Sequence, residues 1–293
     1  MNDVFDNIAW HPGFVAAASI ELRNESGLKL QPEFNLSKEP LRIDLYIQND
    51  EGSSVKNEIG RIFRKYNVIE YKNPSDSLNI DDFFKTLGYA YILKGLGKRV
   101  NEYPEDQITV SLFRDTYPRE LFEYLKSNGR TIEKPFNGIY YITGNVPFPT
   151  QIIVTSELSA DHVSLRVLSK HAKREDVERF IIDMKSATEP GLKLNADAVL
   201  QVSISANREL FDKLKEDTVM CKALEELMSD VIAERELAAA TAAAEAAAEN
   251  AKMLQAKTTA FNLKGIGMAD EAIAKMIDMS VDLVKQWLEI QTV

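Results

Sequence analysis

The sequence predicts an α/β protein in which a mixed sheet is flanked by helices and followed by a helical C-terminal region. Two observations support this fold class. Short segments rich in β-branched and aromatic residues alternate with helical segments over residues 10–160. From about residue 172 onward, apolar residues recur three and four positions apart, as in amphipathic helices. Such an order favours a central sheet with helices on its faces.

The first third of the chain predicts a helix and three strands. The helix covers residues 11–24, where Pro12 falls in the first turn and the apolar residues have helical spacing. Three strands are expected at residues 28–36, at residues 41–49 and at the end of the segment 56–72. A turn is expected at residues 49–53, which read NDEGS.

Further helices and strands continue the alternation. Residues 73–95 combine a turn, an Asp-rich cap and a helix, and residues 117–129 form a helix that Gly129 closes. Strands are expected at residues 107–113, 138–144 and 150–158. Two amphipathic helices are expected at residues 173–186 and 195–217.

A long alanine-rich helix is predicted over residues 219–262. Alanine favours the helix in its middle, at residues 238–248, but buries little apolar surface. Two explanations stay open, namely close helix packing within the chain or across a homo-oligomer, and a solvated spacer. The four expected domains are the α/β domain 1–160, a helical extension of its core at 161–218, the long helix 219–262 and a C-terminal hairpin at 263–293.

The C-terminal hairpin consists of two short predicted helices, at residues 270–277 and 281–290. Ser280 precedes the second helix and is a good N-cap for it. The layout is that of a helix-turn-helix, which many DNA-binding modules use. It is equally the layout of a plain helical hairpin, and the scarcity of basic residues favours the plain hairpin.

Charge and cysteine content limit the functions that the chain can have. The formal net charge of −10 disfavours nonspecific binding to DNA or anionic membranes, although it leaves room for a local basic groove. The single cysteine, Cys221, allows no intrachain disulfide, as expected in a reducing compartment. The sequence contains neither a membrane-spanning apolar run nor a signal-peptide pattern. We therefore expect a cytoplasmic protein without a membrane partner.

Several familiar site patterns are missing from the sequence. The three histidines are scattered, and the absence of HxxxH and CxxC motifs disfavours a zinc site. The short glycine stretches lack a Walker or Rossmann frame, so they do not indicate an ATP or NAD site. No serine stands in a G-x-S-x-G motif.

Two acids and a lysine form the candidate constellation. Glu70 and Lys72 share one face of the third predicted strand because side chains alternate along a strand. If the second strand pairs with the third, Asp44 joins them on that face. One interpretation is a half-solvated antiparallel hairpin that carries a surface Asp and a Glu–Lys pair. The other is a metal-dependent phosphodiesterase, in which two carboxylates hold Mg²⁺ and the lysine assists the attacking water.

The surrounding sequence resembles the PD-(D/E)XK nuclease superfamily, which has the restriction-endonuclease-like fold. The resemblance rests on the order helix, strand, RID44, strand, IE70YK72, helix. It also rests on three longer segments, LRIDLYI, NEIGRIFRKYNVIEYKNPSDSLNIDDFFKTLGYAYILK and PTQIIVTSEL. These segments are similar to the bacterial transposase-like branch of recombination-promoting nucleases. The similarity covers residues 10–160 and extends more weakly beyond them.

The resemblance implies an αβββαβ core and a Mg²⁺-dependent endonuclease that acts on DNA, linked to mobile elements or recombination, with Mn²⁺ as a substitute cation. It implies that Asp44 and Glu70 bind the metal and that Lys72 is the catalytic lysine. Members often add a glutamate from the first helix, and Glu21 is the best match, although an exposed helix-end acid explains it equally well. Glu33 is a weaker substitute. Ile43 stands where many members have a proline.

Two other functions stay open. The nuclease fold can serve as a catalytically silent scaffold that binds DNA or protein as a regulatory module. Alternatively, the long alanine-rich helix can drive self-assembly. On the helix after Lys72, Tyr89 and Tyr91 either line the cleft or belong to the core.

Overall fold

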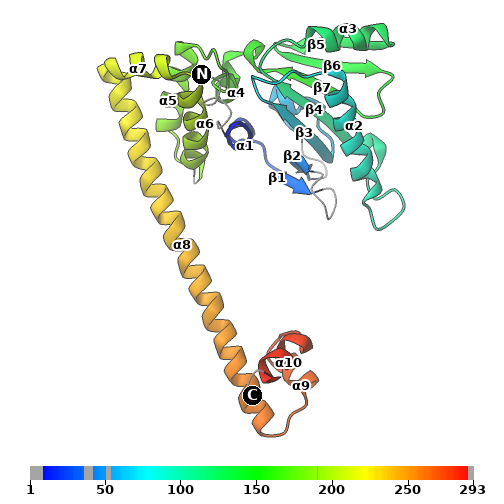
Figure 1. Cartoon of the computed structure of the whole chain (residues 1–293), viewed down its shortest axis with the longest axis vertical. Coiled ribbons are helices and arrows are strands. Elements are labelled where there is room, and N and C mark those ends of the chain that lie inside the picture. Colours follow the sequence, from blue (N-terminus) through cyan, green and yellow to red (C-terminus); the bar gives the residue numbers. More distant parts are fainter. Residues whose placement is uncertain (1–8, 36–41, 51–53, 190, 290–293) are drawn as a thin grey trace. The chain divides into compact units, whose positions relative to one another are not determined.

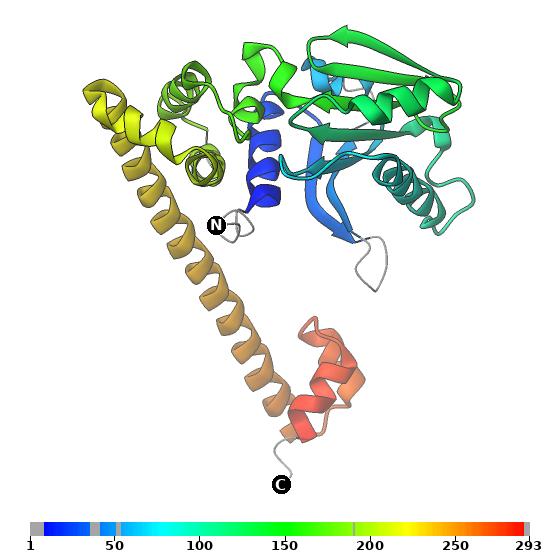
Figure 2. The same cartoon turned by 45° about the horizontal axis from the view of Figure 1, so that its top comes forward.

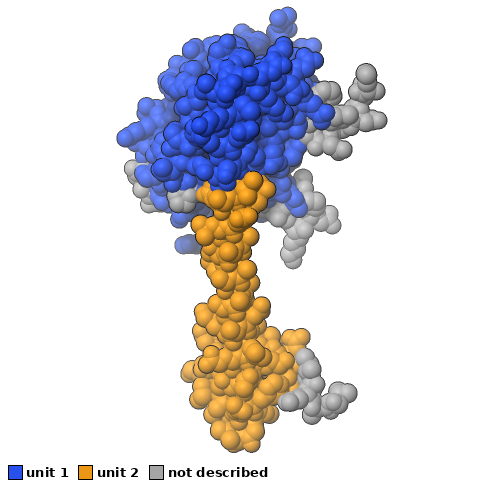
Figure 3. All heavy atoms as spheres, turned by 90° about the vertical axis from the view of Figure 1, so that its left-hand side faces the viewer, with its two compact units in different colours: residues 1–231 blue, residues 232–293 orange. Residues whose placement is uncertain are grey.

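The structure is a computed structural model of the 293-residue chain, and it describes residues 9–35, 42–50, 54–189 and 191–289. The chain divides into two compact units, residues 1–231 and 232–293 (Figure 3). The expected class is confirmed, because a mixed sheet is flanked by helices and followed by a helical C-terminal region (Figure 1). The outer ends of the first two predicted strands, at residues 36 and 41, and most of the turn at 49–53 lie outside the described residues.

The described elements alternate between helix and strand up to residue 154 and are helical thereafter. The strands are β1 (Leu28–Asn35), β2 (Arg42–Asn49), β3 (Tyr66–Lys72), β4 (Ile108–Arg114), β5 (Arg130–Phe136), β6 (Ile139–Gly144) and β7 (Thr150–Val154). The helices are α1 (Trp10–Glu21), α2 (Ile80–Gly95), α3 (Arg119–Ser127), α4 (Val163–Arg166), α5 (Arg174–Lys185), α6 (Leu192–Ala206), α7 (Arg208–Glu216), α8 (Thr218–Gly265), α9 (Asp270–Met276) and α10 (Val281–Glu289). Short 3-10 turns occur at Glu58–Ile62, Glu105–Gln107, Thr155–Glu157 and Ala160–His162.

The seven described strands form one sheet in the order β1-β2-β3-β4-β7-β6-β5. The pairs β3–β4 and β4–β7 are parallel, and the other neighbours are antiparallel. The second and third strands pair antiparallel, with Leu45 opposite Ile69, so the condition for a shared face of Asp44 and Glu70 is met. Because β3 lies inside the sheet and is buried on both faces, the half-solvated hairpin is wrong, and Glu70 is only 6% exposed.

Each face of the sheet has its own core. On one face, α1 lies between the strands and helices α5 and α6, and Phe14 packs against the rings of Tyr71 and Phe113 (Figures 1 and 2). On the other face, α2 and α3 cover the strands with Phe83, Leu87 and Leu121 (Figure 1). The two faces of β3 therefore meet different partners, and α2 is the helix that faces Glu70 and Lys72.

Two parts of the first unit differ from the sequence prediction. Strand β5 was not expected, because its residues are largely exposed and include Pro135, which an edge strand tolerates. The single helix expected at residues 195–217 breaks at Asn207 into α6 and α7. The Asn207 side chain donates to the Ser169 carbonyl and accepts from the Ala172 N–H, so distant residues stabilise the break. Gly129 closes α3 with φ of 75°, as expected.

In the second unit, the end of α8 packs with α9 and α10 around Ala260, Ile273, Val284 and Trp287. Ser280 Oγ accepts the Leu283 N–H at 3.3 Å, which confirms the predicted N-cap. The long predicted helix is present as α8, and its residues 235–252 are all exposed within the chain. A role of this helix in assembly stays a prediction.

Within the described ranges, no helix has both the length and the apolar character needed to cross a membrane.

The close approach of α1 and α6 depends on Gly13, and Gly13→Ala is expected to destabilise the protein. A Cβ at this position would lie 2.5 Å from Val202 Cγ2, in a packed core. We expect a loss of about 1–3 kcal/mol in the free energy of unfolding, measured by urea denaturation. Gly88→Ala in α2 is the matched control, since nothing lies within 4 Å of its Cβ position. That change should be neutral or stabilise the helix by up to about 1 kcal/mol. Equal effects at both sites would contradict the packing explanation.

Candidate functional site

The site lies where the hydrogen-bonded pairing of β2 and β3 ends. Their described ladder begins at Leu45 and Ile69, and one step further Asp44 comes beside Glu70. Asp44 Oδ2 accepts the backbone N–H of Tyr71 at 2.8 Å, so a carboxylate replaces the next carbonyl of the ladder. His11 Nε2, from the first turn of α1, lies 3.7 Å from the same oxygen. Asp44 is thus held from both its own strand pair and the helix on the opposite face.

Both carboxylates have raised pKa values in the folded protein. Burial raises the pKa of Asp44 above its usual range. Burial and then the negative charge of Asp44 raise the pKa of Glu70 to about 7. Glu70 Oε1 lies 3.2 Å from Lys85 Nζ, whereas Oε2 is buried and meets no hydrogen-bond donor in the part of the chain that the structure describes. A further positive charge beside Glu70 Oε2 would therefore stabilise the ionised forms of both carboxylates.

Lys72 completes the cluster through α2. Its Nζ lies 2.7 Å from Asp82 Oδ1, and both side chains are 16% exposed. Asp82 belongs to the capping box of α2, in which its other oxygen accepts the Asn79 N–H and its own N–H binds the Asn79 side chain. The capping box therefore holds Asp82 in place, and Asp82 in turn positions Lys72. The charge of Lys72 in turn lowers the pKa values of both Asp44 and Glu70, against the larger effect of burial.

Glu21 lies apart from this cluster. Its carboxylate is bound by Ser164 Oγ and by His162 Nδ1, the latter at 2.8 Å, and it is buried. Glu21 ends α1, about 15 Å along the helix axis from His11, which contacts Asp44. The alternative Glu33 lies on β1 and is ion-paired with Arg42 at 3.1 Å. The structure brings Asp44, Glu70 and Lys72 together, but it does not bring Glu21 to them.

Three members of the cluster were missed by sequence reasoning, namely His11, Asp82 and Lys85. The spacing of Asp82 and Lys85, three apart at the start of the helix after β3, places both on one face and was the available signal. His11 carried none, because a lone histidine does not reveal its partner. Tyr89 lies near the site, with Lys85 Nζ 5.7 Å from its ring, while Tyr91 packs edge-on against Phe148.

The donor set suits a hard divalent cation better than zinc. No group of three or more His, Cys, Asp or Glu side chains in the described ranges is gathered to hold a metal ion. Mg²⁺ needs fewer protein ligands, since it binds through one or two carboxylates and keeps waters or substrate oxygens. The partly buried Asp44 and the buried Glu70, whose Oε2 has no described partner, fit that requirement.

The fold and the cluster together define a class of site. It is a pair of carboxylates with two lysines at the carboxyl end of strand β3, inside a mixed sheet. Comparisons with family models, curated proteins and solved structures found no match to this chain. The interpretation of the site therefore rests on its own geometry and chemistry.

Glu70 makes stability depend on pH in a direction opposite to that of ordinary ion-paired acids. Its folded pKa of about 7 exceeds the usual 4.5, so the folded state binds more protons between these values. Stability should fall as pH rises from 5 to 8, by up to about 3 kcal/mol from this group. In urea denaturation, Glu70→Gln should remove that part of the slope and be more stable than wild type at pH 8. Glu133→Gln on the exposed edge strand is the control. Identical slopes for Glu70→Gln and wild type would refute the assignment.

Proposed function

We propose that this chain is a metal-dependent endonuclease of the PD-(D/E)XK superfamily that hydrolyses phosphodiester bonds in DNA. One observation carries the proposal: the buried Glu70 and the partly buried Asp44, from neighbouring strands, share a site with two lysines, and one oxygen of Glu70 has no described partner. The element order α1, β1, β2, β3, α2, β4 supports it, because it is the order that the resemblance implies.

In this proposal Asp44 and Glu70 hold Mg²⁺ or Mn²⁺. The cation would neutralise charge on the scissile phosphate and lower the pKa of a bound water. The Tyr71 N–H orients Asp44, and Lys85 orients Glu70 and offsets its charge while the site is empty of substrate. Both carboxylates are thus held in place before substrate arrives, which reduces the reorganisation needed for chemistry.

Lys72 is the group that meets the phosphate. Asp82 holds its ammonium at the carboxyl end of β3, where it offers positive charge to the negative charge that develops during hydrolysis. Because the capping box anchors Asp82, the lysine is positioned by the backbone of α2 and not by a mobile surface acid. Glu21 has no part in this mechanism, since it is occupied by His162 and Ser164.

The alternative of a catalytically silent scaffold has one observation in its favour. Much of the charge of the cluster is already compensated, because Glu70 pairs with Lys85 and Lys72 pairs with Asp82, which leaves only Asp44 without a lysine partner among the described contacts. A site that is balanced without a cation can persist for stability alone. Metal binding and cleavage are therefore tested separately.

Cleavage of supercoiled plasmid in Mg²⁺ or Mn²⁺, and its loss in EDTA, is the expected activity. Asp44→Asn, Glu70→Gln and Lys72→Ala should each lower the rate by about 100-fold or more, because each removes a charge used in the transition state. Lys134→Ala, which breaks an ion pair with Glu157 outside the site, should leave the rate unchanged. Glu21→Gln should lower stability without changing the rate of the folded protein. Cleavage that survives both Asp44→Asn and Lys72→Ala would refute the site.

Metal binding has a readout that does not need catalysis. In the Lys72→Ala variant, Mg²⁺ or Mn²⁺ should raise the midpoint of thermal unfolding, since a ligand that binds only the folded state stabilises it. The double variant Asp44→Asn, Glu70→Gln should show no such rise. A rise in Lys72→Ala together with an absence of cleavage by the wild type would support the silent scaffold.

A further inference from the structure

A hollow in the surface lies next to the candidate site. It has a volume of about 480 Å³, within the range of small-molecule sites, and is formed by the start of α2, the end of β4 and the start of α3. Arg114, which lines it, is the parallel-register partner of Lys72. Neighbouring strands are about 4.8 Å apart, so this hollow begins one strand away from the proposed catalytic lysine.

The chemistry of this hollow is both basic and aromatic. Arg114 and Arg119 line it, and no hydrogen bond or ion pair ties either side chain to another residue in the described part of the chain. Glu120 is the one acid among the described residues that line it. Tyr117 and Tyr124 also line it and are 44% and 41% exposed. Two unpaired guanidinium groups therefore stand beside two accessible aromatic rings.

The exposed ring of Tyr117 is held rigidly. It packs edge-on against Phe122, with ring centroids 4.9 Å apart, and against Tyr140 at 5.7 Å. The first turn of α3 has no side-chain cap, in contrast to the capping box that closes α2. The Arg119 N–H donates to the Tyr117 carbonyl, whereas the next two N–H groups of the turn, at Glu120 and Leu121, stay available to an anion beside Arg119. An aromatic platform and an anion-binding turn are thus preformed side by side.

We propose that this hollow binds an unpaired nucleotide of the nucleic-acid substrate, next to the phosphate that is cut. The inference rests on the proposed function and names its substrate class, which is DNA with a single-stranded or frayed nucleotide at the cleavage site. Aromatic rings stack on any base, and guanidinium groups with helix N–H groups bind the adjoining phosphates. Paired bases within a uniform duplex cannot reach such rings without leaving the stack.

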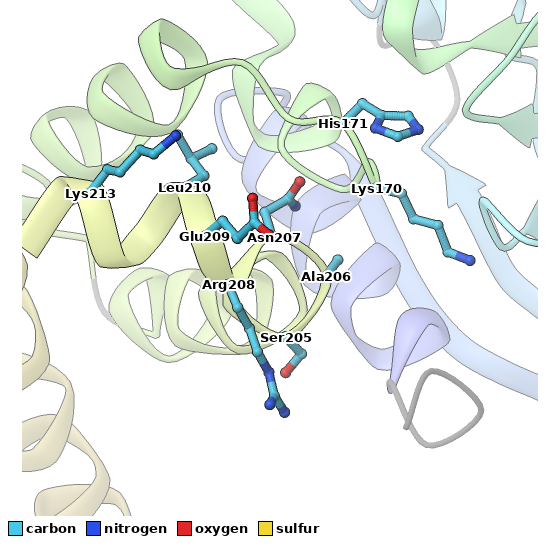
Figure 4. A pocket seen from close by; sticks show the side chains of 9 residues that line it. All are labelled: Lys170, His171, Ser205, Ala206, Asn207, Arg208, Glu209, Leu210 and Lys213. Atoms are coloured by element: carbon cyan, nitrogen blue, oxygen red, sulfur yellow. The ribbon is translucent and has the colours of Figure 1, made fainter. Parts of the chain in front are cut away.

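A different cavity of the same unit provides a contrast. Figure 4 shows it between the loop that carries Lys170 and His171 and the junction of α6 and α7, where Arg208 and Lys213 stand. Its volume is about 510 Å³, and no Phe, Tyr or Trp is among the described residues that line it. It therefore offers charge and one imidazole ring, that of His171, but no tyrosine ring like the two that line the hollow beside Lys72.

The test is binding of the full-length chain to labelled DNA in EDTA, measured by fluorescence anisotropy. The probes are a blunt duplex and the same duplex with a short single-stranded overhang. Wild type should prefer the overhang. Tyr117→Ala and Tyr124→Ala should each weaken overhang binding about tenfold, with blunt-duplex binding unchanged. Tyr117→Phe, which keeps the ring, should bind as wild type does and shows that loss of the ring is the cause.

Tyr91→Ala is the matched control, because Tyr91 is 55% exposed on α2 and packs on Phe148 away from the hollow. It should leave both probes unaffected. Equal binding of overhang and blunt duplex by wild type, or unchanged preference in the Tyr117→Ala, Tyr124→Ala double variant, would overturn the inference. Competition by free dAMP as effective as that by a single-stranded oligonucleotide would also overturn it, in favour of a mononucleotide site.

Failure of this inference can be told apart from failure of the proposed function. Plasmid cleavage that depends on Lys72, together with no overhang preference, removes only the nucleotide site. Selective overhang binding by a chain that never cleaves DNA retains the nucleotide site and removes the nuclease.

Discussion

The structure depends on the placement of two carboxylates, the buried Glu70 and the partly buried Asp44, at the point where β2 and β3 separate. Burial disfavours the charged forms of both and the charge of Asp44 adds to this at Glu70, and neighbouring groups compensate for part of that cost. A backbone N–H meets Asp44, while α2 brings Lys85 to Glu70 and its capping acid brings Lys72 into place. The position and rotation of α2 on the sheet therefore follow from the electrostatics of the strand end as well as from its apolar face.

An acidic protein can still offer a basic surface to nucleic acid. The three parallel strands β3, β4 and β7 end at one edge of the sheet, and ligand sites in open α/β sheets lie at such carboxyl ends. Lys72 and Arg114 are register neighbours at that edge, and Lys85 and Arg119 stand on the helices that follow. The formal net charge of −10 thus coexists with four cations at one edge, of which Lys72 and Lys85 are paired with the acids Asp82 and Glu70.

Strand alternation predicted that Glu70 and Lys72 share a face and that Asp44 would join them if β2 paired with β3, because side-chain direction depends on a period of two. It could not predict that β3 would lie inside the sheet, since its parallel partner comes about 40 residues later. The partner of Glu21 was equally hidden, because His162 lies 141 residues away in sequence. Lys85 required the rotation of α2, which packing sets and composition does not reveal.

An imidazole–carboxylate contact anchors each end of helix α1. The helix contributes the imidazole at one end and the carboxylate at the other. At its start the helix supplies His11 to Asp44, and at its end it supplies Glu21 to His162. One residue more or less between these anchors would turn one end by about 100° and shift it by about 1.5 Å, so both contacts could not be kept. Length variation in this helix is therefore constrained by geometry, because even a whole added turn, which restores the rotation, shifts one anchor by about 5.4 Å.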